Sequence, residues 1–200
     1  YVKETGDFSI LDEMVPFDNE PGSEVSLMEH LRRSFHYTLE HRGPHGLPLI
    51  GRADWNDCLN LNCFSTEPGE SFQTLTGKDG KVAESVMIAG MFAYIGEEYA
   101  ILMKKIGNTA EADRIMKEVE NMREVIMRDG YDGEWFIRAY ADYSRKVGSK
   151  GCEEGKIFIE SQGFCILGKC GIEDGKALKA LDSVEKYLGT KYGLVLNNPA

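Results

Sequence analysis

Two aspartates in one short stretch, Asp54 and Asp57, are the residues best suited to acid–base chemistry in this sequence. They lie three residues apart, so both carboxylates can face one cavity if the segment forms a helical turn or a tight loop. Cleavage of a glycosidic bond by water or by phosphate needs at least one carboxylic acid to protonate the leaving oxygen. Judged by the residues alone, either aspartate could be that acid.

The neighbours of these aspartates suit a sugar. Trp55 offers a flat apolar face for the C–H groups of a sugar ring, while Arg52, Asp54 and Asn56 can hydrogen-bond its hydroxyls. In the alternative interpretation, Asp54 is a helix N-cap and Trp55 a core anchor. Local composition gives the two interpretations roughly equal weight.

Arg138 is a further candidate for substrate binding. It follows Trp135 by three residues, and a second candidate, Glu160, is flanked by apolar residues at a predicted strand end. Both could line a cavity, but a structural ion pair is an equally good interpretation.

The sequence predicts no metal site and no cofactor. A calcium loop needs oxygen ligands at its first, third and fifth positions, Gly at the sixth and Glu at the twelfth, and Cys58, Leu59 and Leu61 break that series. The histidines lack a shared helical spacing and are predicted to be surface or structural residues. Walker and dinucleotide-binding motifs are absent from the sequence.

Composition narrows the possible partners. The net charge is −10, from 23 basic and 33 acidic residues, which argues against nucleic-acid binding because phosphate backbones are met by clusters of Lys and Arg. Apolar runs stay shorter than the ~18 residues of a membrane span. The five cysteines are odd in number and form no Cys-x-x-Cys, which predicts reduced thiols and a cytoplasmic location.

Helical patterns dominate the chain and predict a mainly α fold. The segment 82–106 is apolar on nearly every face, whereas 108–126 carries a narrow apolar stripe after the capping-box sequence Asn108 to Glu111. A buried helix followed by a one-faced helix is what a ring of inner and outer helices requires. Other helices are expected at 5–15, 23–41, 161–167 and 177–188.

One small β-hairpin is expected within this helical fold. Aromatic residues alternate along 135–140 as they would in a short strand, and 156–160 is predicted to be its antiparallel partner across the Gly-rich span 148–155.

Five segments, in this order, resemble the cellobiose phosphorylase family, the inverting phosphorylases of glycoside hydrolase family 94. They are Tyr1 to Asp7, Leu11 to Phe17, Gly46 to Asp57, Trp135 to Tyr140 and Asp174 to Val184. The resemblance covers the whole chain, and one matching segment is twelve residues long. The continuation Asn60 to Thr66 is most similar to the cellobiose-cleaving members.

The resemblance implies a fold and a reaction. The fold is part of an (α/α)6 toroid catalytic domain, and the reaction converts cellobiose and inorganic phosphate to α-glucose 1-phosphate and glucose with inversion. Asp57 is then the general acid, and Trp55 lines the subsite beside the scissile bond. Phosphate is a co-substrate and attacks the anomeric carbon itself, so no protein base is required.

The resemblance also sets expectations for the whole protein. Residues 1–200 are expected to be an internal fragment of the toroid, without the family's N-terminal β-sandwich domain and the C-terminal part of the barrel, and to be inactive alone. The full-length protein is expected to be a homodimer. An inverting β-glucoside hydrolase and a non-catalytic sugar-binding fragment are the alternatives.

Overall fold

The structure, a computed structural model, describes residues 1–51, 81–141 and 144–199. The described chain is mainly helical and divides into two compact units, Tyr1–His41 and Arg42–Ala200. The prediction of a mainly α fold is thus confirmed, while the closure of a toroid stays a prediction. Residues 52–62, which carry the side chains predicted to do chemistry, lie outside the described residues.

The first unit combines short elements with one longer helix. Its elements are α1 (Val2–Thr5), the 3-10 helix η1 (Ser9–Asp12), β1 (Met14–Val15), β2 (Val25–Ser26) and α2 (Leu27–Glu40). Two boundaries differ from the predictions: there is no single helix over 5–15, and α2 begins at Leu27, after its N-cap Ser26, instead of at residue 23. The reason is that Met14 pairs with Ser26 and Val15 with Val25, which keeps these residues extended.

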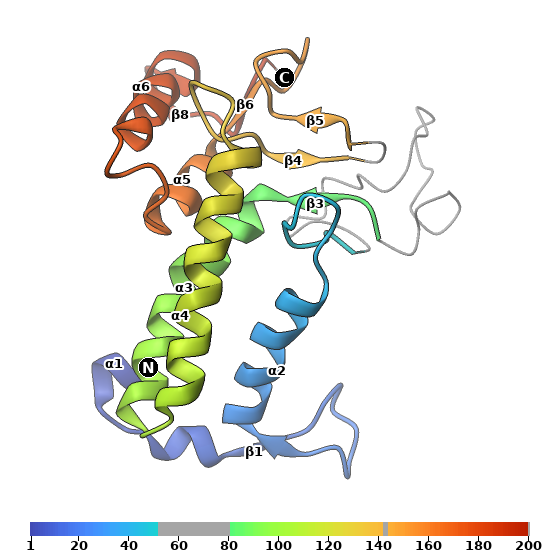
Figure 1. The fold of residues 1–200 in the computed structure, drawn as a ribbon, viewed down its shortest axis with the longest axis vertical. Helices are drawn as coiled ribbons and strands as arrows, with labels where there is room; N and C mark the ends of the chain where they lie inside the picture. The colour runs from blue at the N-terminus through green and yellow to red at the C-terminus, as the bar shows by residue number, and fades with distance from the viewer. Residues whose placement is uncertain (52–80, 142–143, 200) are drawn as a thin grey trace. The chain divides into compact units, whose positions relative to one another are not determined.

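The second unit is built on four helices. They are α3 (Val86–Lys105), α4 (Thr109–Val125), α5 (Ile159–Leu167) and α6 (Lys176–Leu188), and a π-helical turn, η2 (Ile126–Gly130), extends α4. Helix α4 packs along α3, α5 packs against α3, and α6 packs against α5 (Figure 1). The four predicted helices of this unit are confirmed, although α3 starts at Val86 because Glu84 and Ser85 form the strand β3.

The burial of α3 and α4 follows the predicted division into a buried and a one-faced helix. The buried residues of α3 lie on more than one face of the helix, and Val86, Phe92 and Met103 are among them. Buried residues of α4 are confined to the predicted stripe Ala112, Ile115, Val119 and Met122. Its predicted cap is also confirmed, since Asn108 accepts a hydrogen bond from Glu111 N at 3.2 Å.

Helix α3 is the one described helix with the length and composition of a membrane span. More than half of that stretch, 56%, is buried inside the fold. The core helix of a compact domain has the same length and apolar composition, and the packing of α3 against α4 and α5 accounts for both.

Short strands connect the helices, and their pairing corrects the predicted hairpin. Strand β4 (Ala139–Tyr140) pairs with β3 (Glu84–Ser85) and with β5 (Lys146–Val147), so 156–160 is not its partner. Strand β6 (Ile157–Phe158) pairs with β9 (Asn197–Asn198), and β7 (Gly189–Thr190) with β8 (Gly193–Leu194). The Trp135 Nε1–H donates a hydrogen bond to the Lys156 carbonyl at 2.9 Å. This side-chain bond stands in place of the backbone hydrogen bonds expected between 135–140 and 156–160.

Helices α3 and α5 approach each other at two glycines. A Cβ at Gly90 would lie 2.6 Å from the Cys165 backbone N, and one at Gly168 would lie 2.8 Å from the Gly90 carbonyl oxygen. Two backbones can come this close only where the side chain is a hydrogen.

Helix α6 buries only some of its apolar residues. Ala177, Val184 and Leu188 are buried, whereas Leu178 and Leu181 are 65% and 48% exposed. Ala180 and Ser183 occupy the buried face in their place, because small residues allow α6 to lie close to its neighbours.

Candidate functional site

Five predicted site residues, Arg52, Asp54, Trp55, Asn56 and Asp57, lie outside the described residues. The chain that leads directly to them, 42–51, is described, and so are Arg138 and its surroundings. The described part of the site is therefore the frame at the start of α3 from which the Asp-Trp-Asn-Asp run departs.

Backbone hydrogen bonds tie segment 42–51 to the strand that precedes α3. Ile50 N donates to the Ala83 carbonyl and Ser85 N donates to the Pro48 carbonyl, both at 2.9 Å. Leu49 also forms an antiparallel bridge with Glu84. Because Ser85 is the N-cap of α3 and accepts from Ile88 N at 3.1 Å, the segment is joined to the first turn of the buried helix.

The Glu84 carboxylate holds the turn of this segment from inside. Its Oε1 accepts hydrogen bonds from His45 N at 3.0 Å and from Leu47 N at 3.1 Å, and Oε2 is hydrogen-bonded to His45 Nδ1 at 2.5 Å. Glu84 is fully buried, and a buried carboxylate is tolerated only when it is hydrogen-bonded or paired in this way. A Cβ at Gly43 would lie within 2.7 Å of Oε1, so only glycine admits the carboxylate there.

His45 is held by two further contacts. Its ring stacks on Tyr140 with a centroid distance of 3.8 Å and an angle of 15°, and its carbonyl accepts from Arg128 Nη2 at 3.1 Å. Burial raises the pKa of Tyr140 to about 12, and the protonated hydroxyl donates to the Asp129 carbonyl at 2.8 Å. The prediction that His45 is structural agrees with these contacts.

Arg138 lies in the core on β4. Its side chain is fully buried, with Nε 3.8 Å from Glu160 Oε1 and Nη1 donating to Ser85 Oγ at 3.4 Å. Glu160 comes from the first turn of α5, not from a strand end as expected. These contacts join β3, β4 and α5 and support the structural interpretation, while the substrate-binding role of Arg138 stays a prediction.

Gln162 is a further buried polar residue, two positions after Glu160 on α5. Its Oε1 accepts from Phe136 N at 2.9 Å, and its Nε2 donates to the Phe136 and Phe158 carbonyls at 2.7 and 2.9 Å. The side chain therefore substitutes for a strand partner of residue 136. Ser161 Oγ, buried beside it, has no hydrogen-bond partner in the described part of the chain.

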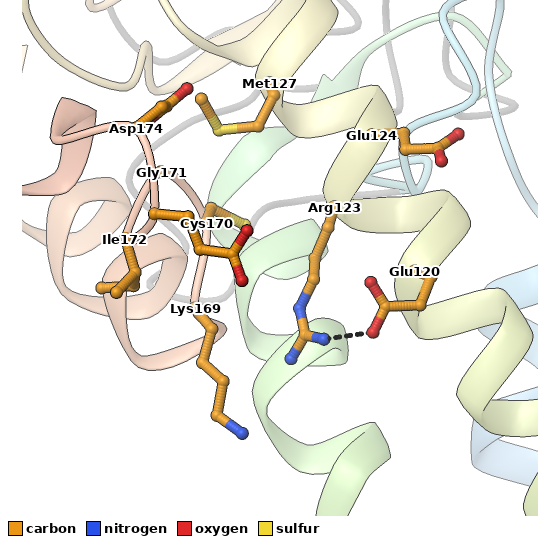
Figure 2. A pocket seen from close by; sticks show the side chains of 10 residues that line it. Glu120, Arg123, Glu124, Met127, Lys169, Cys170, Gly171, Ile172 and Asp174 are labelled. Carbon is orange, nitrogen blue, oxygen red and sulfur yellow. Dashed lines mark hydrogen bonds and ion pairs between the residues drawn. The ribbon is translucent and has the colours of Figure 1, made fainter.

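A pocket of about 510 Å³ opens between α4 and the α5–α6 connection (Figure 2). Its cation Arg123 is already engaged, with Nη1 2.6 Å from Glu120, Nη2 2.5 Å from Glu97 and Nε 2.7 Å from the Gly168 carbonyl. Lys169 Nζ lies 2.5 Å from the second oxygen of Glu97. Arg138, the predicted site residue that the structure describes, does not line this pocket.

Within residues 1–51, 81–141 and 144–199, no group of three or more His, Cys, Asp or Glu is arranged to hold a metal ion.

Glu84 belongs to no motif that marks it as functional in the sequence. The available signal was an acidic residue directly before the N-cap of the most apolar helix, a place where a charge has to be compensated.

Packed helices, with segment 42–51 joined to the start of the buried helix α3, define the class of this protein as a mainly helical domain. The family follows from sequence comparison. The chain belongs to the glycosyl hydrolase 94 superfamily, whose catalytic-domain model matches residues 1–200.

Individual relatives are similar over the whole of this chain. It is 30% identical over 203 residues to an N,N'-diacetylchitobiose phosphorylase of Vibrio proteolyticus and covers 22% of that protein. It is 30% identical to a solabiose phosphorylase of Paenibacillus borealis and 28% identical to a cellobionic acid phosphorylase of Neurospora crassa, covering 24% and 23% of them. The chain thus spans about a quarter of the length of these curated relatives.

Proposed function

We propose that the full-length protein is an inverting disaccharide phosphorylase. The observation that carries the proposal is the family match over residues 1–200, together with relatives that are named as phosphorylases and align with the entire chain. The anchored segment 42–51 adds support, because it fixes the chain that directly precedes the polar run in the sequence.

In this reaction Asp57 acts as the general acid. Its carboxyl group donates a proton to the glycosidic oxygen while a phosphate oxygen attacks the anomeric carbon from the opposite face. The bond to the leaving sugar breaks as the bond to phosphate forms, so the products are an α-sugar 1-phosphate and the released sugar. No protein base is required, because phosphate is already anionic, and no cofactor takes part in this step.

The remaining residues of the run bind the sugar. Trp55 stacks on the ring beside the scissile bond, and Arg52, Asp54 and Asn56 contact hydroxyl groups. Asp54 and the phosphate dianion are both negative charges near Asp57. They help to keep it protonated near neutral pH.

Cellobiose is the substrate we propose, with α-glucose 1-phosphate and glucose as products. The resemblance of the Asn60 to Thr66 continuation supports it. The relatives are named for N,N'-diacetylchitobiose, solabiose and cellobionic acid. These three disaccharides are the competing substrates.

We further propose that the protein is a cytoplasmic homodimer.

The test incubates the full-length protein with each of the four disaccharides in phosphate buffer and measures the sugar 1-phosphate formed. The expected result is the highest kcat/KM with cellobiose. A higher value with one of the other three would keep the reaction and replace the substrate. No sugar phosphate from any of them would contradict the proposed function.

A further inference from the structure

We infer that Glu84 is a positioning residue for the reaction, acting through the turn that it holds. The inference rests on the proposed function, since it concerns the segment that leads to Asp57. Its evidence, however, comes entirely from the described residues 42–51, 81–85 and their neighbours.

Glu84 is the point where three parts of the fold meet. Its backbone belongs to β3 and pairs with Tyr140 of β4, and it bridges to Leu49. Its side chain turns back to accept from two backbone N–H groups of the turn, those of His45 and Leu47. One residue therefore fixes the turn from both its backbone and its side chain.

The remaining contacts leave the turn few alternatives. Gly43 N donates to the Leu47 carbonyl and Gly46 N donates to the Gly43 carbonyl, both at 2.9 Å, and Leu47 is fully buried. Gly46 and Gly51 have φ of 86° and 72°, a region that other residues rarely adopt. Without the carboxylate, the His45 and Leu47 N–H groups would lose their acceptor, and a buried N–H without a partner is costly.

The chemical consequence depends on chain continuity. Asp57 follows Gly51 by six residues, so the direction in which the chain leaves the frame limits where the carboxyl group can be placed. A change far from the reacting atoms that displaces a catalytic group by about 1 Å can lower turnover roughly 100-fold. Loss of Glu84 should therefore lower kcat more than it changes sugar binding.

The experiment compares Glu84→Ala with Glu97→Ala in the full-length protein. Glu97 is the control because it lies on α3, the helix that follows β3 directly, and its carboxylate also has two partners, Arg123 and Lys169. We expect Glu84→Ala to lower kcat roughly 10- to 100-fold with little change in the sugar KM, and Glu97→Ala to leave both within about twofold. Glu84→Gln keeps an oxygen acceptor for the two N–H groups and should restore most of kcat.

Hydrogen–deuterium exchange supplies a second readout. Peptides covering 42–51 should exchange faster in Glu84→Ala and unchanged in Glu97→Ala. If Glu84→Ala is not recovered folded, Glu84→Asp, which withdraws the carboxylate by one methylene, should show the same loss of kcat. Wild-type kcat in folded Glu84→Ala or Glu84→Asp, or an equal loss in Glu97→Ala, would overturn the inference. A wild-type protein without phosphate-dependent cleavage would instead refute the proposed function, and exchange at 42–51 would still test the anchor.

Discussion

Asp57 is the residue on which the proposed chemistry depends most. Replacement by Asn keeps the size and polarity of the side chain but removes the proton that the leaving oxygen needs. We expect Asp57→Asn to lower kcat for phosphorolysis by about 10²- to 10⁴-fold, the usual contribution of a general acid, with the disaccharide still bound. Steady-state kinetics and calorimetric titration with the substrate measure the two effects. Turnover near that of the wild type would remove Asp57 from this role.

Gln162 illustrates a buried polar residue with a structural role. Gln162→Leu would leave the N–H and the carbonyl of Phe136 without partners, since both now bond to this side chain. At about 1–3 kcal/mol for each of these two buried groups, we expect a loss of about 2–6 kcal/mol in the free energy of unfolding. Denaturant unfolding of the variant and the wild type measures it.

The adjacent Ser161 is the control for this change. Its Oγ is buried without a hydrogen-bond partner among the described residues, so Ser161→Ala should change stability by less than about 1 kcal/mol. A similar loss in both variants would show that the cost comes from the location and not from the bonds to Phe136.

At the scale of elements, Gly90 sets the distance between α3 and α5. Gly90→Ala would place a Cβ 2.6 Å from Cys165 N and 2.7 Å from Phe164 C, both backbone atoms. Overpacking of this kind costs about 1–3 kcal/mol, which exceeds the ~1 kcal/mol that Ala gains over Gly in a helix. We therefore expect a net loss of stability in thermal or denaturant unfolding.

Gly163 of α5 is the matched glycine. A Cβ there meets no atom within 4 Å, so Gly163→Ala should gain up to about 1 kcal/mol from helix propensity alone. If both variants were stabilised alike, the close approach of α3 and α5 would be wrong.

The Glu97 carboxylate of α3 forms pH-dependent ion pairs with Arg123 of α4 and with Lys169, which follows α5. Burial alone would raise the pKa of the Glu97 carboxyl, but hydrogen bonds from Lys169 and Arg123 outweigh it and lower the pKa below its ordinary value. A carboxyl with a lowered folded-state pKa stabilises the fold above its unfolded pKa, and this contribution is lost as the pH falls through the folded pKa.

The expected result is a difference in stability between the wild type and Glu97→Gln that depends on pH. It should be constant, at about 0.5–1 kcal/mol for a partly exposed pair, above about pH 5, and should shrink as the pH falls below about 4. Unfolding measured in denaturant across this range tests it. A difference that grew toward acid pH would reverse the assigned sign.

The helices were predictable because their signals are local. The Asn108 capping box and the stripe from Ala112 to Met122 specify α4 without reference to the rest of the chain. Strand pairing was not predictable in the same way. The partner of 139–140 depends on the Trp135 indole and the Gln162 amide, which take up backbone groups that a ladder would otherwise use.

The candidate site was predictable only in part, because the types of neighbouring residues are a local signal and the contacts of Glu84 are not. The Asp-Trp-Asn-Asp run stands out by residue type, whereas the role of Glu84 depends on Gly43 to Leu47 folding back onto it across almost forty residues of chain. Arg138 stood out as a charge among aromatic residues, but only the structure shows that Glu160 and Ser85 lie beside it.

For the whole molecule, the central claim is that bond cleavage requires phosphate as the nucleophile. The family contains relatives named as phosphorylases, yet a toroidal hydrolase with a second carboxylate about 6.5–9.5 Å from Asp57 would cleave the same bond with water. The two reactions differ in what is attached to the anomeric carbon of the product.

The most direct measurement follows the products of cellobiose by NMR during the first turnovers of the full-length protein, with and without inorganic phosphate. The account predicts that one α-glucose 1-phosphate appears for each glucose released when phosphate is present, and that no cleavage occurs when it is absent. Two glucose molecules per cellobiose at the same rate in both buffers would contradict it.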